Sequence, residues 1–232
     1  MKIAVMQPYF FPYIGYFQLM AAVDRFVLFD NVQYVRQGWI NRNRILLDGQ
    51  PGTFTLPLKK ASRFLNINCR TLSEEPFRTR LLNQLHAAYR HAPYANDIFP
   101  VLEEIVEFES SDLFAYLHHS LKVLKRVLSL KCELLISSEI DIDPTLRAQD
   151  KILEICRSQR ADTYINLPGG RALYSAEAFA QQGMTLHFIQ PDDFHYPQYG
   201  EAFVPWLSII DVMMFNSKNA VIGLCQEKWS LN

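Results

Sequence analysis

The chain has 232 residues, of which 49% are hydrophobic and 20% charged, a balance typical of a folded globular protein and not of a disordered one. The formal net charge of -1 provides no basic field for DNA or RNA, so we expect no nucleic-acid partner. The apolar runs are too short for a membrane span and no secretory signal begins the chain, which indicates a cytoplasmic protein.

The four cysteines form no C-x-x-C pair, the close spacing that usually supplies zinc ligands. We therefore expect no metal site. Cys132 and Cys156 lie inside apolar stretches, where a small buried side chain is the favoured interpretation.

The N-terminal third predicts a strand, a helix, a second strand and a hairpin. The first three elements are residues 3–7, 14–22 and 25–30. Asp48-Gly49 supplies the positive φ angles of a tight turn, which predicts a hairpin between residues 44–47 and 53–58.

A helical insertion follows at about residues 73–130, where apolar residues recur at helical spacing. Ser73 and Pro76 are typical of a helix start. Strands and helices then alternate, at residues 133–137, 146–157, 163–166, 176–182 and 185–189.

This order predicts one α/β domain over residues 1–232, built on a doubly wound, mainly parallel, Rossmann-like sheet of about five strands. Strands 3–7 and 25–30 should be adjacent at its centre, because continuously apolar strands are covered on both faces. Ligands of such sheets bind beyond the carboxyl ends of the strands, where the strand order reverses.

The loop after the first strand is the first candidate binding segment. Five aromatic residues lie between Tyr9 and Tyr16, more than packing requires, and Gly15 lets a ligand approach the backbone. Amides at the following helix start could hold a phosphate or carboxylate. Packing within the core is the alternative. The candidate ligand contacts are Gln7, Tyr13, Gly15 and Tyr16.

The segment after the second strand combines an acid, arginines, amides and aromatic rings. Arginine binds phosphate or carboxylate oxygens in pairs, and amides and aromatic rings suit sugars or bases. A solvated loop is the alternative, and we favour it for Arg36. The candidate contacts are Gln33, Tyr34, Trp39, Asn41, Arg42 and Arg44, and Asp30 is a candidate catalytic base.

Two later segments complete the candidate site. Gly169 and Gly170 follow a predicted strand, and consecutive glycines can form an anion-binding concavity from their amides. Ser208 can cap a helix whose first turn holds Asp211, a second catalytic candidate, although a purely structural helix is favoured there. Four rings are further pocket candidates, namely His187, His195, Tyr196 and Tyr199, although His187 lies in a predicted strand and a core position is favoured for it.

The first two segments resemble the WbqC-like protein family through QPYFFPYIGYFQLMAAVDRFVLFDNVQYVRQGWINRNRI, residues 7–45. Further resemblance lies in LPLKK, YINLPGGRALY and LSIIDVMMFN. This resemblance implies a role in bacterial surface polysaccharide (O-antigen, lipopolysaccharide) biosynthesis.

A more distant resemblance is to HIGH-type nucleotidyltransferases, in which Tyr13-Ile14-Gly15-Tyr16 takes the place of H-x-G-H. Tyrosine cannot supply the cation that histidine offers a phosphate, so this resemblance implies the fold and the pocket position more than nucleotidyl transfer.

Together these features favour a transferase acting on an activated, phosphate-bearing sugar or acyl donor. An ATP-dependent carboxylate-activating ligase or aminoacyl-type transferase is one alternative, and a non-catalytic nucleotide-binding module is another. The expected ligand is a nucleotide or nucleotide sugar, with no certain cofactor, and the sequence leaves homo-oligomer formation open.

Overall fold

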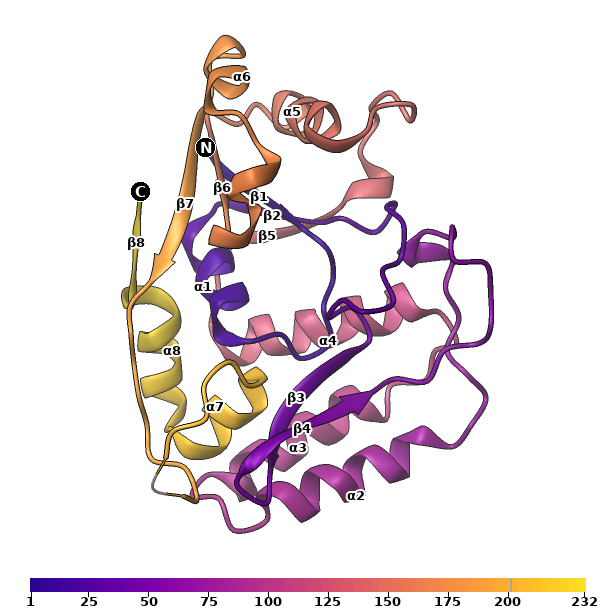
Figure 1. Cartoon of the computed structure of the whole chain (residues 1–232), viewed down its shortest axis with the longest axis vertical. Coiled ribbons are helices and arrows are strands. Elements are labelled where there is room, and N and C mark those ends of the chain that lie inside the picture. The colour runs from indigo at the N-terminus through magenta and orange to yellow at the C-terminus, as the bar shows by residue number, and fades with distance from the viewer. Residues whose placement is uncertain (201) are drawn as a thin grey trace.

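The computed structural model describes residues 1–200 and 202–232. Within them, a six-stranded sheet has the order β5-β2-β1-β6-β7-β8 (Figure 1). The strands are β1 (Lys2–Met6), β2 (Arg25–Leu28), β5 (Glu133–Ile136), β6 (Thr163–Asn166), β7 (Thr185–Pro191) and β8 (Trp229–Leu231). The first five are parallel and β8 is antiparallel to β7. The predicted mainly parallel sheet, with β1 beside β2, is confirmed, and β8 is an element that the sequence did not predict.

Helices cover both faces of the sheet. Ala4 and Phe26 contribute to a large core shared with α1 (Ile14–Ala22) and α8 (Lys218–Glu227). Ile3 and Val27 point the other way, into a smaller core with α5 (Ala148–Ser158) and α6 (Ala176–Gln181). In Figure 1, α5 and α6 lie above the sheet and α1 and α8 below it. Alternate strand side chains thus build two separate cores, which is why the strands are apolar throughout.

A second group of elements lies below the sheet in Figure 1. It consists of the hairpin β3 (Arg42–Leu47) and β4 (Gln50–Thr55) with α2 (Phe77–Tyr89), α3 (Ala95–Val106) and α4 (Leu113–Val127). The remaining elements are η1 (Ile67–Cys69), η2 (Ser137–Glu139), η3 (Pro168–Leu173) and α7 (Ile209–Phe215). None of the helices in residues 1–200 and 202–232 is long and apolar enough to cross a membrane.

Local sequence signals explain where two of these elements begin. Asp48 and Gly49 have φ angles of 48° and 75°, so the predicted hairpin turn is confirmed. Helix α2 begins at Phe77, later than the expected start at Ser73, and no side chain caps it. Proline disfavours helical geometry in the residue before it, so the helix begins only after Pro76.

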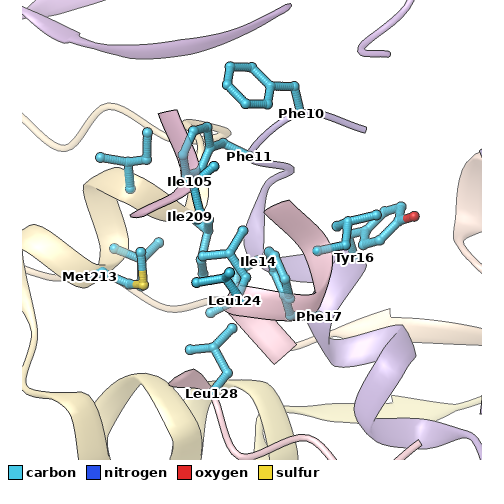
Figure 2. Close-up of a cluster of buried hydrophobic side chains, with 14 of the residues drawn as sticks. Phe10, Phe11, Ile14, Tyr16, Phe17, Ile105, Leu124, Leu128, Ile209 and Met213 are labelled. Carbon is cyan, nitrogen blue, oxygen red and sulfur yellow. The ribbon is translucent and has the colours of Figure 1, made fainter. Parts of the chain in front are cut away.

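The loop between β1 and α1 is anchored in the large core. Figure 2 shows Phe11 near Ile209 of α7 and Ile14 near Leu124 of α4, and these four residues and Phe10 are all buried. Segments from three distant parts of the sequence therefore hold the start of α1 in place.

Candidate functional site

A cavity of about 590 Å³ lies at the point where the strand order reverses. The chain goes from β1 to β2 and β5 on one side, then returns to β6 and β7 on the other. The segments that follow β1 and β6 contribute Tyr13, at the start of α1, Gly15 in the first turn of α1, and Gly169 of η3 to the cavity wall. The cavity thus lies beyond the carboxyl ends of these two adjacent strands, the position expected for a ligand site in a parallel sheet.

The rest of the wall is mainly aromatic and apolar, with two acidic side chains. The lining residues are Tyr13, Ile14, Gly15, Gln18, Pro168, Gly169, Gln190, Pro191, Asp192, Asp193, Phe194, His195, Tyr196, Phe203, Pro205, Trp206, Leu207 and Val212. Within the described part of the chain, Asp192 and Asp193 are the carboxylates of this wall, and neither lysine nor arginine lines it. Such a surface suits a ligand with apolar faces and hydrogen-bond donors.

A smaller pocket of about 270 Å³ adjoins this main cavity and shares Tyr13 and Trp206 with it. We call it the Arg44 pocket, and its other lining residues are Tyr9, Pro12, Trp39, Asn43 and Arg44. The Arg44 guanidinium donates to the Trp206 carbonyl oxygen at 3.0 Å and lies 5.4 Å from the centre of the Trp39 ring. Its buried Nε has no hydrogen-bond partner among the residues described. The Arg44 pocket therefore contains a cation whose hydrogen-bonding capacity is only partly used within the described residues.

Hydrogen bonds fix the wall between the two pockets. The Asn43 amide donates to the Phe10 and Phe11 carbonyl oxygens at 3.2 and 2.8 Å, and the Ser208 hydroxyl donates to Phe11 O at 2.7 Å. Phe11 and Trp206 have φ angles of 44° and 61°, a left-handed conformation that is unusual for bulky residues. Backbone strain of this kind persists only where surrounding contacts impose it, and it often marks functional sites.

Tyr13 and Gly15 form a matched pair at this wall. A Cβ atom at Gly15 would lie 2.4 Å from the Tyr13 ring, so the ring can occupy its position only over a glycine. The Tyr13 and Trp206 ring centres are 6.0 Å apart. Burial raises the pKa of Tyr13 to about 12, so its hydroxyl is a neutral donor at physiological pH.

Other aromatic residues of the first segment belong to the core and not to the site. Phe10, Phe11 and Tyr16 have no exposed surface. The Tyr16 hydroxyl donates to the Gln7 carbonyl oxygen at 3.0 Å, and burial raises its pKa well above the ordinary value. The interpretation that these aromatics exceed the needs of packing is thus wrong for three of the five, because three helices converge on this loop.

Some candidate residues of the segment after β2 likewise bond within the fold and do not face the main cavity. Asn41 is buried, accepts from the Tyr34 hydroxyl at 2.7 Å and donates to Leu56 O at 2.7 Å. Arg42 donates to the Gly38 and Gln37 carbonyl oxygens at 3.2 and 2.9 Å. Tyr13, Gly15 and Gly169 line the main cavity together, whereas neither Asn41 nor Arg42 lines it.

Three further candidates are satisfied within the fold. The Gln33 amide is exposed and donates to Arg63 O at 3.0 Å, and Tyr34 lies under the Arg70 guanidinium at 4.7 Å. Gly170 donates its amide to Leu167 O at 2.9 Å. An anion-binding nest of successive backbone amides requires one residue in a right-handed and the next in a left-handed conformation. Neither Gly169 nor Gly170 has a positive φ, so their amides do not form such a nest.

Asp30 is a buried carboxylate with a complete set of donors. It is 1% exposed and accepts from Ser138 N at 2.9 Å, from Ser138 Oγ at 2.6 Å and from Asn68 Nδ2 at 2.9 Å. Nearby, Lys151 is 6% exposed and donates to Asn31 Oδ1 at 2.8 Å, and burial lowers its pKa. These bonds join the carboxyl ends of β2 and β5, away from the residues that line the main cavity.

Asp211 is also buried, on the far side of the cavity wall. It has no exposed surface and accepts from the Tyr89 and Tyr196 hydroxyls at 2.8 and 2.7 Å and from Gln198 Nε2 at 2.6 Å. Burial raises the pKa of the carboxyl, although these three donors oppose the shift. The catalytic roles of Asp30 and Asp211 stay predictions, and their surroundings favour structural ones.

The sequence had not singled out several residues of the main cavity. Asp192, Asp193 and Phe203 belong to the segment after β7, where the rule that ligands bind beyond parallel strands could have placed them. Gln18 is a polar residue within an apolar helix, which was a usable signal. Of the predicted rings, His195 and Tyr196 line the cavity. No cluster of three or more potential metal ligands occurs in residues 1–200 and 202–232.

Comparison with known proteins confirms the resemblance seen in the sequence. Residues 7–222 match the model of the WbqC-like protein family. The chain is 25% identical over 222 residues to the uncharacterized protein Rv1507c of Mycobacterium tuberculosis, and the match covers 93% of each chain. No solved structure matches it.

Proposed function

Because the chain belongs to the WbqC-like protein family, we propose that it is an enzyme of bacterial surface polysaccharide (O-antigen) biosynthesis that binds a phosphate-bearing sugar. The observation that carries this proposal is the pair of adjoining pockets that share Tyr13 and Trp206. One pocket offers aromatic, amide and carboxylate groups, and the other offers Arg44. A sugar bound in the first would direct its phosphate into the second.

The side chains support this orientation. Aromatic rings pack against the apolar faces of a sugar, and amides and carboxylates accept hydrogen bonds from its hydroxyls. A phosphate would suit the guanidinium of Arg44, which binds anionic oxygens through several donors at once. We assign the phosphate to Arg44 and not to Arg42, because two Arg42 donors already bind backbone carbonyl oxygens.

We propose His195 as the acid–base group of a transfer reaction. It lines the main cavity, is exposed, and packs against Phe203 with ring centres 4.7 Å apart. Histidine exchanges protons near neutral pH, as transfer to or from a sugar hydroxyl requires. Asp30 and Asp211 suit this role less well, because each is buried and already accepts three hydrogen bonds.

A non-catalytic sugar- or nucleotide-binding module is the second candidate. Tyrosines at both histidine positions of the H-x-G-H motif favour this non-catalytic function, because they cannot supply the cation of a histidine. Tyr16 is also buried, with its hydroxyl bound to the Gln7 carbonyl oxygen. A ligase that activates a carboxylate with ATP has less support. The described lining of the main cavity contains no lysine or arginine to hold a triphosphate.

Substitution of Arg44 tests the proposal. A thermal-shift screen of sugar phosphates and nucleotide sugars should identify a stabilising ligand, whose affinity is then measured by calorimetry. Arg44→Ala should weaken binding by about 1.5–3 kcal/mol, the usual value of a hydrogen bond to a charged group. Arg44→Lys should also bind less tightly, because it keeps the charge and loses the paired geometry.

Arg36→Ala is the matched control, since Arg36 is exposed in the loop before β3, lines neither pocket, and its replacement makes the same change in net charge. It should bind like the wild type. Melting curves establish that each variant is folded. The proposal is refuted if no sugar phosphate or nucleotide sugar binds, or if folded Arg44→Ala retains wild-type affinity.

A further inference from the structure

The two adjoining pockets carry opposite charges. Asp192 and Asp193 line the main cavity, and neither makes an ion pair with another described residue. Arg44 supplies the charge of the smaller pocket. The shared rings of Tyr13 and Trp206 separate the two regions. A ligand that spans both pockets would therefore have its anionic end at Arg44 and an electron-poor group in the main cavity.

Gln18 adds an acceptor at the side of the main cavity formed by α1. It has no exposed surface, and it lies three residues after Gly15, on the same helix face. Its Nε2 donates to the Leu224 and Lys228 carbonyl oxygens at 3.0 and 3.1 Å, which determines the orientation of the amide. Its Oε1 has no donor among the described residues. A buried acceptor without a partner is unfavourable, so a ligand N–H that reaches Oε1 through a small adjustment of the side chain would be stabilised there.

We infer that the sugar bound in the main cavity carries a protonated amine, so that the ligand is an amino-sugar phosphate. This inference rests on the proposed function. The two carboxylates attract the ammonium group, the aromatic walls stabilise it through their π faces, and Gln18 accepts one of its protons. The same carboxylates repel a phosphate, which therefore binds at Arg44.

Neutral sugars provide the sharpest comparison. A hydroxyl in place of the amine can donate a hydrogen bond, but it lacks the charge that Asp192 and Asp193 attract. An N-acetyl group removes the charge and adds bulk. We therefore expect the amine to be preferred to both groups by roughly five- to tenfold, the combined effect of partly exposed ion pairs and cation–π contacts.

Calorimetry with three probes tests the inference: glucosamine 1-phosphate, glucose 1-phosphate and N-acetylglucosamine 1-phosphate. The wild type should prefer the first. The double variant Asp192→Asn/Asp193→Asn should lose this preference and bind glucose 1-phosphate at least as well as the wild type does. Asp141→Asn/Asp150→Asn, an equal change of charge at two exposed residues outside the main cavity, should keep it.

The outcomes separate this inference from the function on which it rests. Equal affinity of the wild type for the three probes refutes the amine and leaves sugar-phosphate binding intact. An amine preference that persists in Asp192→Asn/Asp193→Asn refutes the assigned carboxylates. If none of the probes binds to the folded wild type, the inference fails, whereas the proposed function fails only if no other sugar phosphate or nucleotide sugar binds either.

Discussion

The buried carboxylate of Asp211 joins α7 to α2 and to the segment that lines the main cavity, so its removal should destabilise the whole chain. Asp211→Ala leaves the Tyr89 and Tyr196 hydroxyls and the Gln198 amide without this acceptor. Gln198 still donates to Val204 O at 3.2 Å, and Tyr196 is 9% exposed and can reach water. The Tyr89 hydroxyl is fully buried and loses its acceptor outright.

The variant thus leaves the Tyr89 hydroxyl without this acceptor and lets the Tyr196 hydroxyl bind water instead. From these two changes we expect Asp211→Ala to lower the free energy of unfolding by about 2–4 kcal/mol. For a chain of this length that corresponds to a decrease of roughly 5–15 °C in melting temperature. Asp211→Asn should have about half the effect, because the amide keeps one oxygen and no longer buries a charge.

Urea unfolding followed by circular dichroism measures these differences. Asp150→Asn is the control, since Asp150 is an exposed acid in the first turn of α5 and should change the free energy of unfolding by at most about 0.5 kcal/mol. A stability of Asp211→Ala equal to that of this control would refute the structural role. If the variant were also inactive, the catalytic role of Asp211 would be favoured instead.

Three further measurements follow from buried groups. Gln18→Met should lower the free energy of unfolding by about 1–2 kcal/mol in urea melts, because the carbonyl oxygens of Leu224 and Lys228, at the C-terminal end of α8, lose their donor. The exposed control Gln181→Met should leave the free energy of unfolding unchanged. At about pH 8 a thiol reagent should modify one cysteine in the native chain, the exposed Cys69, and all four in urea; reaction of a second native thiol would contradict the burial. Burial raises the pKa of Cys132 to about 11 and of Cys156 and Cys225 to about 12. Burial also raises the pKa of the Asp211 carboxyl above 3.8, so protonation of this carboxyl stabilises the native chain. This stabilisation is complete below pH 3.8 and is lost as the pH rises through the folded-state pKa. The excess stability of the wild type over Asp211→Asn should therefore shrink as the pH rises through that window in urea melts, and an increase would contradict the shift.

Local patterns predicted the sheet and much of the chain's order. Continuously apolar strands alternate with helices, and this pattern alone placed β1 beside β2 in a parallel sheet. Asp48-Gly49 determined the hairpin turn, and Ser208 caps α7 by accepting from Ile210 N, as its position predicted. These features depend on interactions between residues close in the sequence or on the two faces of a strand, so a single sequence contains them.

The tertiary structure decided which polar and aromatic residues face the cavity. Tyr13 and Tyr16 belong to one short motif, yet Tyr13 lines the cavity and Tyr16 is buried, because α1 turns one toward η3 and the other into the core. Arg42 and Arg44 differ in the same way: Arg42 binds the turn before it, whereas Arg44 reaches Trp206, which is 162 residues away in the sequence. Whether a side chain is satisfied within the fold or left free for a ligand depends on partners that only the folded chain brings into contact.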